Sequence, residues 1–167
     1  KTSLLKIISG INKADGDVIL NEKNMIVPQK PVYLRGNVRN NLIEKNLTIE
    51  EKNWWLNEVG LLEFSDRDPR TLSGGELQRL NVARCFASNA NLMILDEFTS
   101  NLDGPNVLQM ESFISEHTKR GGSVILATHN PIQAKRISDK IFIMFDVELV
   151  DEQHPKISSL VDGNCMG

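Results

Sequence analysis

Two neighbouring carboxylates, Asp96 and Glu97, follow a short apolar run at residues 92–95. The run predicts a buried strand whose carboxyl end carries both acids. In open α/β sheets, ligands bind outside that edge. A carboxylate there can hold Mg²⁺, directly or through water, and a second one can orient or deprotonate a water molecule. Taken alone, the pattern fits equally well with two acids that only cap a strand end.

The chain opens with Lys1, Thr2 and Ser3, just before a helical pattern of apolar residues. A lysine followed by a hydroxyl residue at a helix start is typical of the end of a phosphate-binding loop. In that chemistry the lysine reaches the β- and γ-phosphates and the hydroxyl of Thr2 ligates Mg²⁺. Such tripeptides are common, so this signal is weak by itself.

A glycine-rich helix start lies at residues 72–76, which read Leu-Ser-Gly-Gly-Glu. Ser73 is a good N-cap, and Gly74 and Gly75 let a ligand approach the backbone closely. The free N–H groups of a helix start suit an anion. The competing interpretation is a helix cap without chemical consequence.

The elements that would position these residues alternate between strands and helices. Helical spacing predicts helices that begin at Ser73, Gly104 and Pro131. Continuous apolar runs predict buried strands at residues 92–95, 123–127 and 141–145. Because these runs are continuous rather than alternating, we expect a parallel sheet covered on both faces.

Two segments before residue 66 have their own local signals. Residues 17–20 and 25–27 are β-type runs around a turn, which predicts a tight hairpin. Residues 38–65 are helical and polar, and we interpret them as an insertion into the α/β domain. Within them, Thr48 and Glu51 form a capping-box signature and Gly60 is a stop signal.

Composition excludes several classes of protein. The chain has 167 residues, 40% hydrophobic and 25% charged, which excludes a disordered or collagen-like chain. Its net charge of −3 disfavours a sequence-independent nucleic-acid binder. Cys85 and Cys165 are far apart, so neither a disulfide framework nor a metal site is expected, as suits a reducing cytosol. No apolar run is long enough to span a bilayer, and we expect no secretory leader.

Together the motifs resemble those of the ABC (ATP-binding cassette) ATPases, in the order of that family. Residues 72–76 resemble its signature motif. The other matches are Lys1-Thr2-Ser3 with the end of Walker A, Gln29 with the Q-loop, residues 92–97 with Walker B, residues 100–103 with the D-loop and His129 with the switch histidine.

The resemblance implies an α/β fold of the P-loop NTPase (RecA-like) type, with a mostly parallel sheet and an inserted helical subdomain. It implies a single ABC ATPase domain over residues 1–167, lacking its N-terminal strand and Walker A glycines, with a helical signature subdomain at about 38–90. Without those glycines, we expect the chain as given to bind ATP weakly or not at all. Phe98 stands where the family usually has proline.

The resemblance also implies roles for individual residues. Glu97 would be the general base, with His129 and Gln29 as the other catalytic residues. Mg²⁺ would be held by Thr2, Gln29 and Asp96. ATP would be bound by Lys1, Thr2, Ser3, Gln29, Ser73, Gly74, Gly75, Glu76, Asp96 and Asp103, with the signature motif acting on the ATP of a second subunit.

The implied partners are a second copy in a head-to-tail dimer and a separate membrane permease, with no nucleic acid. The protein would work at the cytoplasmic face of the plasma (inner) membrane, without a transmembrane segment of its own. Tyr33, Leu34 and Val38 would either contact the permease or pack internally.

The type of ABC protein is a further expectation. Residues 30–41 and 128–136, and the tail ending at Asn164, are similar in texture to importers of tungstate and related oxyanions. The alternatives are a non-transport ABC module and a catalytically silent, truncated cassette that acts as an interaction domain.

Overall fold

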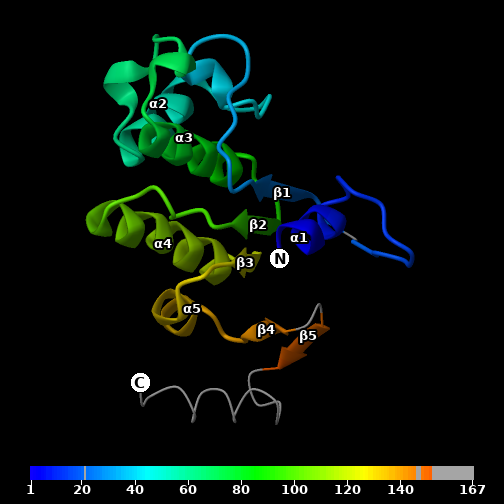
Figure 1. Cartoon of the computed structure of the whole chain (residues 1–167). Helices are drawn as coiled ribbons and strands as arrows, with labels where there is room; N and C mark the ends of the chain where they lie inside the picture. The colour runs from blue at the N-terminus through cyan, green and yellow to red at the C-terminus, as the bar shows by residue number, and fades with distance from the viewer. Residues whose placement is uncertain (21, 146–147, 152–167) are drawn as a thin grey trace. The chain divides into compact units, whose positions relative to one another are not determined.

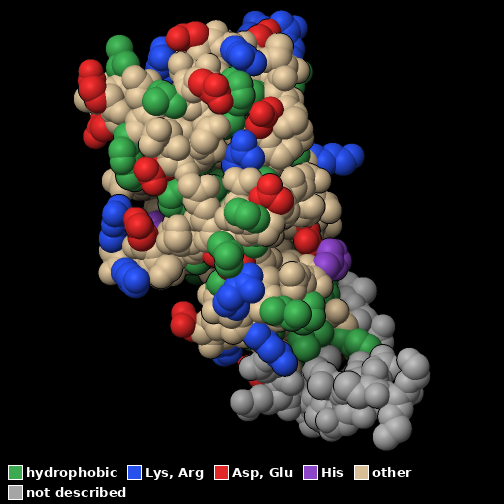
Figure 2. Space-filling view, turned by 90° about the vertical axis from the view of Figure 1, so that its left-hand side faces the viewer, with side chains coloured by type: hydrophobic (Ala, Val, Ile, Leu, Met, Phe, Trp, Pro, Cys, Tyr) green, Lys and Arg blue, Asp and Glu red, His purple; other side chains and the backbone are tan. Residues whose placement is uncertain are grey.

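The computed structural model describes residues 1–20, 22–145 and 148–151. The chain divides into two compact units, one from Lys1 to His129 and one that begins at Asn130. Within the described part, no helix is both long and apolar enough to cross a membrane. Figure 2 shows one face of the molecule, where acidic and basic side chains are interspersed.

The first unit is built on a three-stranded sheet in the order β1-β2-β3. The strands are β1 (Asn24–Val27), β2 (Leu92–Asp96) and β3 (Ser123–Ala127). Both pairings are parallel, with Val27 opposite Leu95 and Asp96 opposite Ala127. The predicted parallel sheet is therefore confirmed, and the carboxyl ends of all three strands lie at one edge (Figure 1).

Helices cover both faces of this sheet. On one face, Leu5 of helix α1 (Thr2–Ile8) packs with Ile94 and Ala127. The next residue of β2, Met93, points the other way, where its sulfur lies 3.1 Å from the sulfur of Cys85 on helix α3 (Gly74–Ala87). Helix α4 (Gly104–Lys119) contacts both α3 and β3. Side chains buried from both sides explain the continuous apolar runs.

The helical stretch between β1 and α3 contains α2 (Ile49–Glu58) and three short 3₁₀ helices, η1 (Arg39–Asn41), η2 (Leu62–Phe64) and η3 (Pro69–Thr71). The predicted capping box is present, because Thr48 and Glu51 each accept a hydrogen bond from the other's backbone N–H. Gly60, at φ 65°, follows the end of α2 as predicted. Helices α2 and α3 contact each other and lie beyond β1 (Figure 1).

The predicted hairpin at residues 17–27 is wrong. Residues 17–20 form no strand, and Val18, Ile19 and Leu20 are exposed. Residues 24–27 do form a strand, but its backbone pairs with β2. A turn signal between two apolar segments does not reveal a more distant pairing partner, and the sheet provides one.

The second unit contains α5 (Pro131–Ile137), β4 (Phe142–Phe145) and β5 (Glu148–Asp151). The predicted helix start at Pro131 is confirmed, with Asn130 as its N-cap. The expected placement of residues 141–145 in the parallel sheet is wrong, because β4 pairs antiparallel with β5. Its apolar run is only partly buried, and Phe142 is half-exposed. The tail toward Asn164 lies outside the described residues.

Candidate functional site

The carboxyl edge of the sheet gathers residues from distant parts of the sequence. β2 ends at Asp96, whose side chain is buried, at 2% exposed. β3 ends at Ala127, directly opposite Asp96, and is followed by Thr128 and His129. Because the strands are parallel, Asp96 at the end of β2, Glu97 just after it and His129 after β3 lie at the same edge of the sheet.

Glu97 is turned toward this edge by an unusual backbone conformation. Its φ is 49°, in the left-handed region that a non-glycine residue seldom adopts. Its N–H donates to the carbonyl of Ala127 at 2.9 Å. Its carboxylate oxygen Oε1 lies 3.3 Å from Nε2 of His129 and receives no hydrogen bond from any described residue. The glutamate side chain is 11% exposed and the histidine 78%.

Lys1 reaches the other nitrogen of the same histidine. Its Nζ donates to the carbonyl of Thr128 at 2.9 Å and lies 3.3 Å from Nδ1 of His129. A lysine ammonium group has only N–H donors, so Nδ1 of His129 is the acceptor in this contact. The structure thus joins Lys1, Glu97 and His129 in one polar chain.

Thr2 and Ser3 form the first turn of α1, with Lys1 at the N-cap. Thr2 is half-buried and Ser3 is exposed. The first intrahelical donor is the N–H of Leu5, which bonds to Lys1. The N–H groups before it have no partner within the helix and point toward its N-terminus.

The helix start at Ser73, which the sequence makes a candidate anion site, forms a complete capping box. Ser73 N–H donates to the Glu76 carboxylate at 2.7 Å, and Glu76 N–H donates to Ser73 Oγ at 3.3 Å. The hydrogen bond from the Ser73 backbone lowers the pKa of Glu76 below its ordinary value. A Cβ on Gly75 would lie 3.0 Å from the carbonyl of Asn101, whereas Gly74 has open space around it. The side-chain bonds of Ser73 and Glu76 join them to each other, not to the Lys1–Glu97–His129 cluster.

Asp103 and Gln29 are the last two of the site residues expected from the sequence. Asp103 is the N-cap of α4, and its carboxylate accepts from the backbone and side-chain nitrogens of Asn106, which lower its pKa. Gln29 follows β1 by two residues, at the same sheet edge as Asp96, and is exposed. The structure therefore brings Lys1, Glu97 and His129 into contact, whereas Gln29 is exposed.

Comparison with known proteins decides the family. The family model described as "ABC transporter" matches residues 1–100, more than half of the chain. The chain belongs to the ABC transporter family. The expected membership of the ABC family is thereby confirmed.

Individual ABC relatives agree. The aliphatic sulfonates import ATP-binding protein SsuB 3 of Rhodococcus jostii (strain RHA1) is 33% identical over 86% of this chain and 56% of its own length. The phosphate import ATP-binding protein PstB 2 of Natronomonas pharaonis is 38% identical over 58% of this chain and 34% of its own length. The chain thus spans about a third to a little over half the length of these relatives.

Solved structures confirm the ABC fold. The ATP-binding cassette MJ0796, solved as a dimer in a post-hydrolysis state with ADP and Pi, superimposes with a TM-score of 0.77. The match covers 88% of this chain and 77% of that one, at 22% identity. The predicted P-loop NTPase type of α/β fold is therefore correct.

Several polar residues of this ABC chain were not singled out from the sequence. Gln78, Asn81 and Arg84 all lie buried on α3. Arg84 donates to the carbonyl of Asn41, and Gln78 donates to that of Phe98. The sequence signal for these residues is a polar side chain at a core-facing position of a helix, because buried polar groups need specific partners.

The three candidate residues for a permease contact differ in how far they are buried. Val38 is fully buried, so it packs internally. Tyr33 and Leu34 are 50% and 37% exposed and remain accessible. Their neighbour Val32 is held to α3 through both its N–H and its carbonyl, which bond to Asn81.

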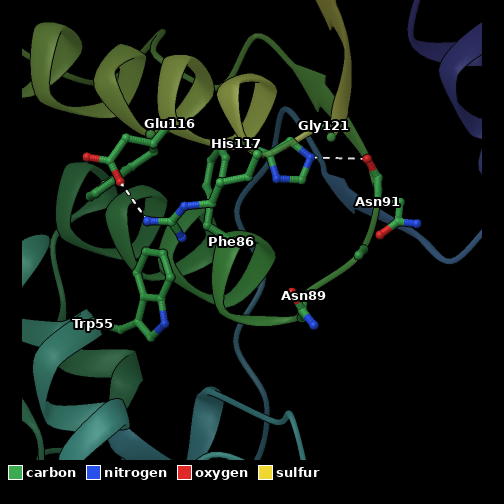
Figure 3. Close-up of a pocket in the computed structure, with 11 residues that line it drawn as sticks. Trp55, Phe86, Asn89, Asn91, Glu116, His117 and Gly121 are labelled. Atoms are coloured by element: carbon green, nitrogen blue, oxygen red, sulfur yellow. Dashed lines mark hydrogen bonds and ion pairs between the residues drawn. The ribbon is translucent and has the colours of Figure 1, made fainter.

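A separate cavity of about 240 Å³ lies at the opposite edge of the sheet (Figure 3). Asn91 and Gly122, which line it, immediately precede β2 and β3. Trp55, Phe86 and His117 also line it, and His117 Nε2 lies 3.1 Å from the carbonyl of Asn91. None of the predicted site residues belongs to this cavity.

Proposed function

We propose that this chain is the ATP-hydrolysing subunit of an ABC importer. The observation that carries the proposal is the chain of contacts from Lys1 through His129 to Glu97, beside the buried Asp96. Three motifs that are distant in sequence meet at the sheet edge where α/β proteins bind ligands. Relatives named as import ATP-binding proteins for sulfonates and phosphate support the importer assignment.

The residues at this edge suit a nucleotide with Mg²⁺. The ammonium group of Lys1 and the free N–H groups at the start of α1 match the β- and γ-phosphates. The Thr2 hydroxyl, the Asp96 carboxylate and Gln29 are oxygen donors, which Mg²⁺ prefers while it keeps several waters. When bound, Mg²⁺ would neutralise the negative charge that develops on the phosphates during hydrolysis.

Glu97 is suited to act as the general base. Its buried oxygen Oε1 makes no hydrogen bond to any residue that the structure describes, and it can accept a hydrogen bond from water. Glu97 would take a proton from that water as its oxygen bonds to the γ-phosphorus and the bond to the β–γ bridging oxygen breaks. His129 would then orient Glu97 and touch the γ-phosphate, and Lys1 would hold the phosphate charge.

The signature motif is assigned to the ATP of a partner subunit. Gly74 has open space around it, and Ser73 is exposed at a helix N-terminus. In a head-to-tail dimer these residues, with Gly75 and Glu76, would meet the phosphates held by the other copy, and Asp103 would link the two sites. In such a dimer, a two-fold axis would relate two equal sites, and ATP bound at both would drive the two subunits together.

The remaining parts of the proposal concern partners and solute. The exposed Tyr33 and Leu34 would contact a membrane permease, which would keep the chain on the cytoplasmic face of the membrane. An oxyanion, with tungstate as the specific hypothesis, is the proposed solute. The named solutes of the two import relatives, sulfonates and phosphate, are themselves oxyanions.

The test of hydrolysis is phosphate release by the chain with a glycine-rich phosphate loop joined before Lys1, here called the loop-completed form. We expect Glu97→Gln to lower turnover by at least ~10²-fold, the usual scale for losing a general base. Binding of ATP, measured by calorimetry, should survive. Equal turnover in the variant would remove Glu97 from this role, and no turnover in the parent would refute the ATPase proposal.

A further inference from the structure

The turn that follows β2, residues 97–102, must be held in place by its surroundings. Glu97 has a left-handed backbone, which a non-glycine residue keeps only when neighbouring structure imposes it. Phe98 is not proline, so no ring fixes its φ. The direction of the Glu97 carboxylate therefore depends on contacts made by the turn.

Three of these contacts are backbone hydrogen bonds. Glu97 N–H donates to Ala127 at 2.9 Å, Ser100 N–H donates to Glu97 at 3.0 Å, and Leu102 N–H donates to Thr99 at 3.1 Å. They fix both ends of the turn. The carbonyl of Phe98 lies between them and takes part in none of these bonds.

That carbonyl is bound by a buried glutamine on another element. Nε2 of Gln78, on α3, donates to Phe98 O at 2.9 Å, and the side chains of both residues are fully buried. Oε1 of Gln78 is buried too and finds no hydrogen-bond partner among the described residues. An unsatisfied buried oxygen is costly, and an apolar side chain of the same size would avoid that cost. The amide is therefore explained by the bond that it makes to the turn.

We propose that Gln78 is a positioning residue for Glu97. By binding Phe98 O, it ties the turn to α3 and keeps the Glu97 carboxylate facing His129. Gly75, on the same helix, lies close to Asn101 at the far end of the turn, since a Cβ on it would be 3.0 Å from the Asn101 carbonyl oxygen. The turn therefore packs closely against α3. This inference rests on the proposed role of Glu97 in hydrolysis.

The test replaces Gln78 by methionine, which keeps the volume but has no N–H donor. Gln109→Met is the control, because the side-chain amide of Gln109 also donates to a backbone carbonyl, that of Glu58, at an exposed site away from the turn. Amide hydrogen exchange at Ser100 and Leu102 should become at least about tenfold faster in Gln78→Met only. In the loop-completed form, kcat should fall about tenfold with KM for ATP unchanged, and the melting temperature should not drop.

Hydrogen exchange and turnover test the role of Gln78 and the proposed function separately. Unchanged exchange at Ser100 and Leu102 would overturn the positioning role, whatever the turnover. Faster exchange with an unchanged kcat would also overturn it, because the turn would then not direct Glu97. If the parent protein hydrolyses no ATP, the proposed function fails, while the exchange experiment still decides whether Gln78 holds the turn.

Discussion

At the scale of single residues, His129 is the centre of the candidate site. It contacts Lys1 through Nδ1 and Glu97 through Nε2, so one imidazole links a cation to a carboxylate. Its side chain is 78% exposed, whereas Glu97 is almost covered. An exposed ring between two buried or anchored groups can move when phosphate arrives, and this freedom suits a residue that senses the γ-phosphate.

Lys1 is predicted to contribute to binding more than to chemistry. Lys1→Met removes a charged donor to the phosphates, and hydrogen bonds to charged groups contribute about 1.5–3 kcal/mol. We therefore expect the Kd for ATP of the loop-completed form to rise roughly 10- to 100-fold, as measured by calorimetry. Lys6→Met on the same helix is the control and should leave the Kd unchanged. An equal effect of both substitutions would contradict a specific role for Lys1.

At the scale of elements, the sequence shows helix caps directly but does not show which strand β1 pairs with. The capping boxes at Thr48 and Ser73 involve residues three apart, so the sequence shows both partners. The pairing of β1 with β2 depends on a strand that lies far along the chain, and the turn signal misled. The role of Gln78 was missed because its partner is a backbone carbonyl, which no residue type identifies.

The two capping boxes allow a test that separates stability from function. Thr48→Ala and Ser73→Ala should each lower the free energy of unfolding by about 1 kcal/mol, the typical loss for an N-cap. Only Ser73→Ala should also impair ATP turnover, because only that helix start is proposed to face nucleotide. Urea unfolding and phosphate release measure the two effects. Equal turnover in both variants would place Ser73 outside the site.

At the scale of the whole molecule, the exposed segment that follows Gln29 is the proposed link to the membrane. Tyr33→Asp combined with Leu34→Asp should release the chain from membranes of its own cells, because burying two carboxylates at an apolar contact is costly. Leu108→Asp, at an exposed apolar position on α4, is the control. Sedimentation with the membrane fraction gives the readout. Retention of the double variant on membranes would disprove this contact.

The most direct test of the central claim is light scattering of the Glu97→Gln variant with and without MgATP. Both the 167-residue chain and the loop-completed form are measured, because the family resemblance places a glycine-rich loop before Lys1. We predict that the loop-completed form changes from monomer to dimer when MgATP is added, since the signature residues of each copy would close over the other's ATP. A loop-completed protein that binds ATP and stays monomeric would contradict the account.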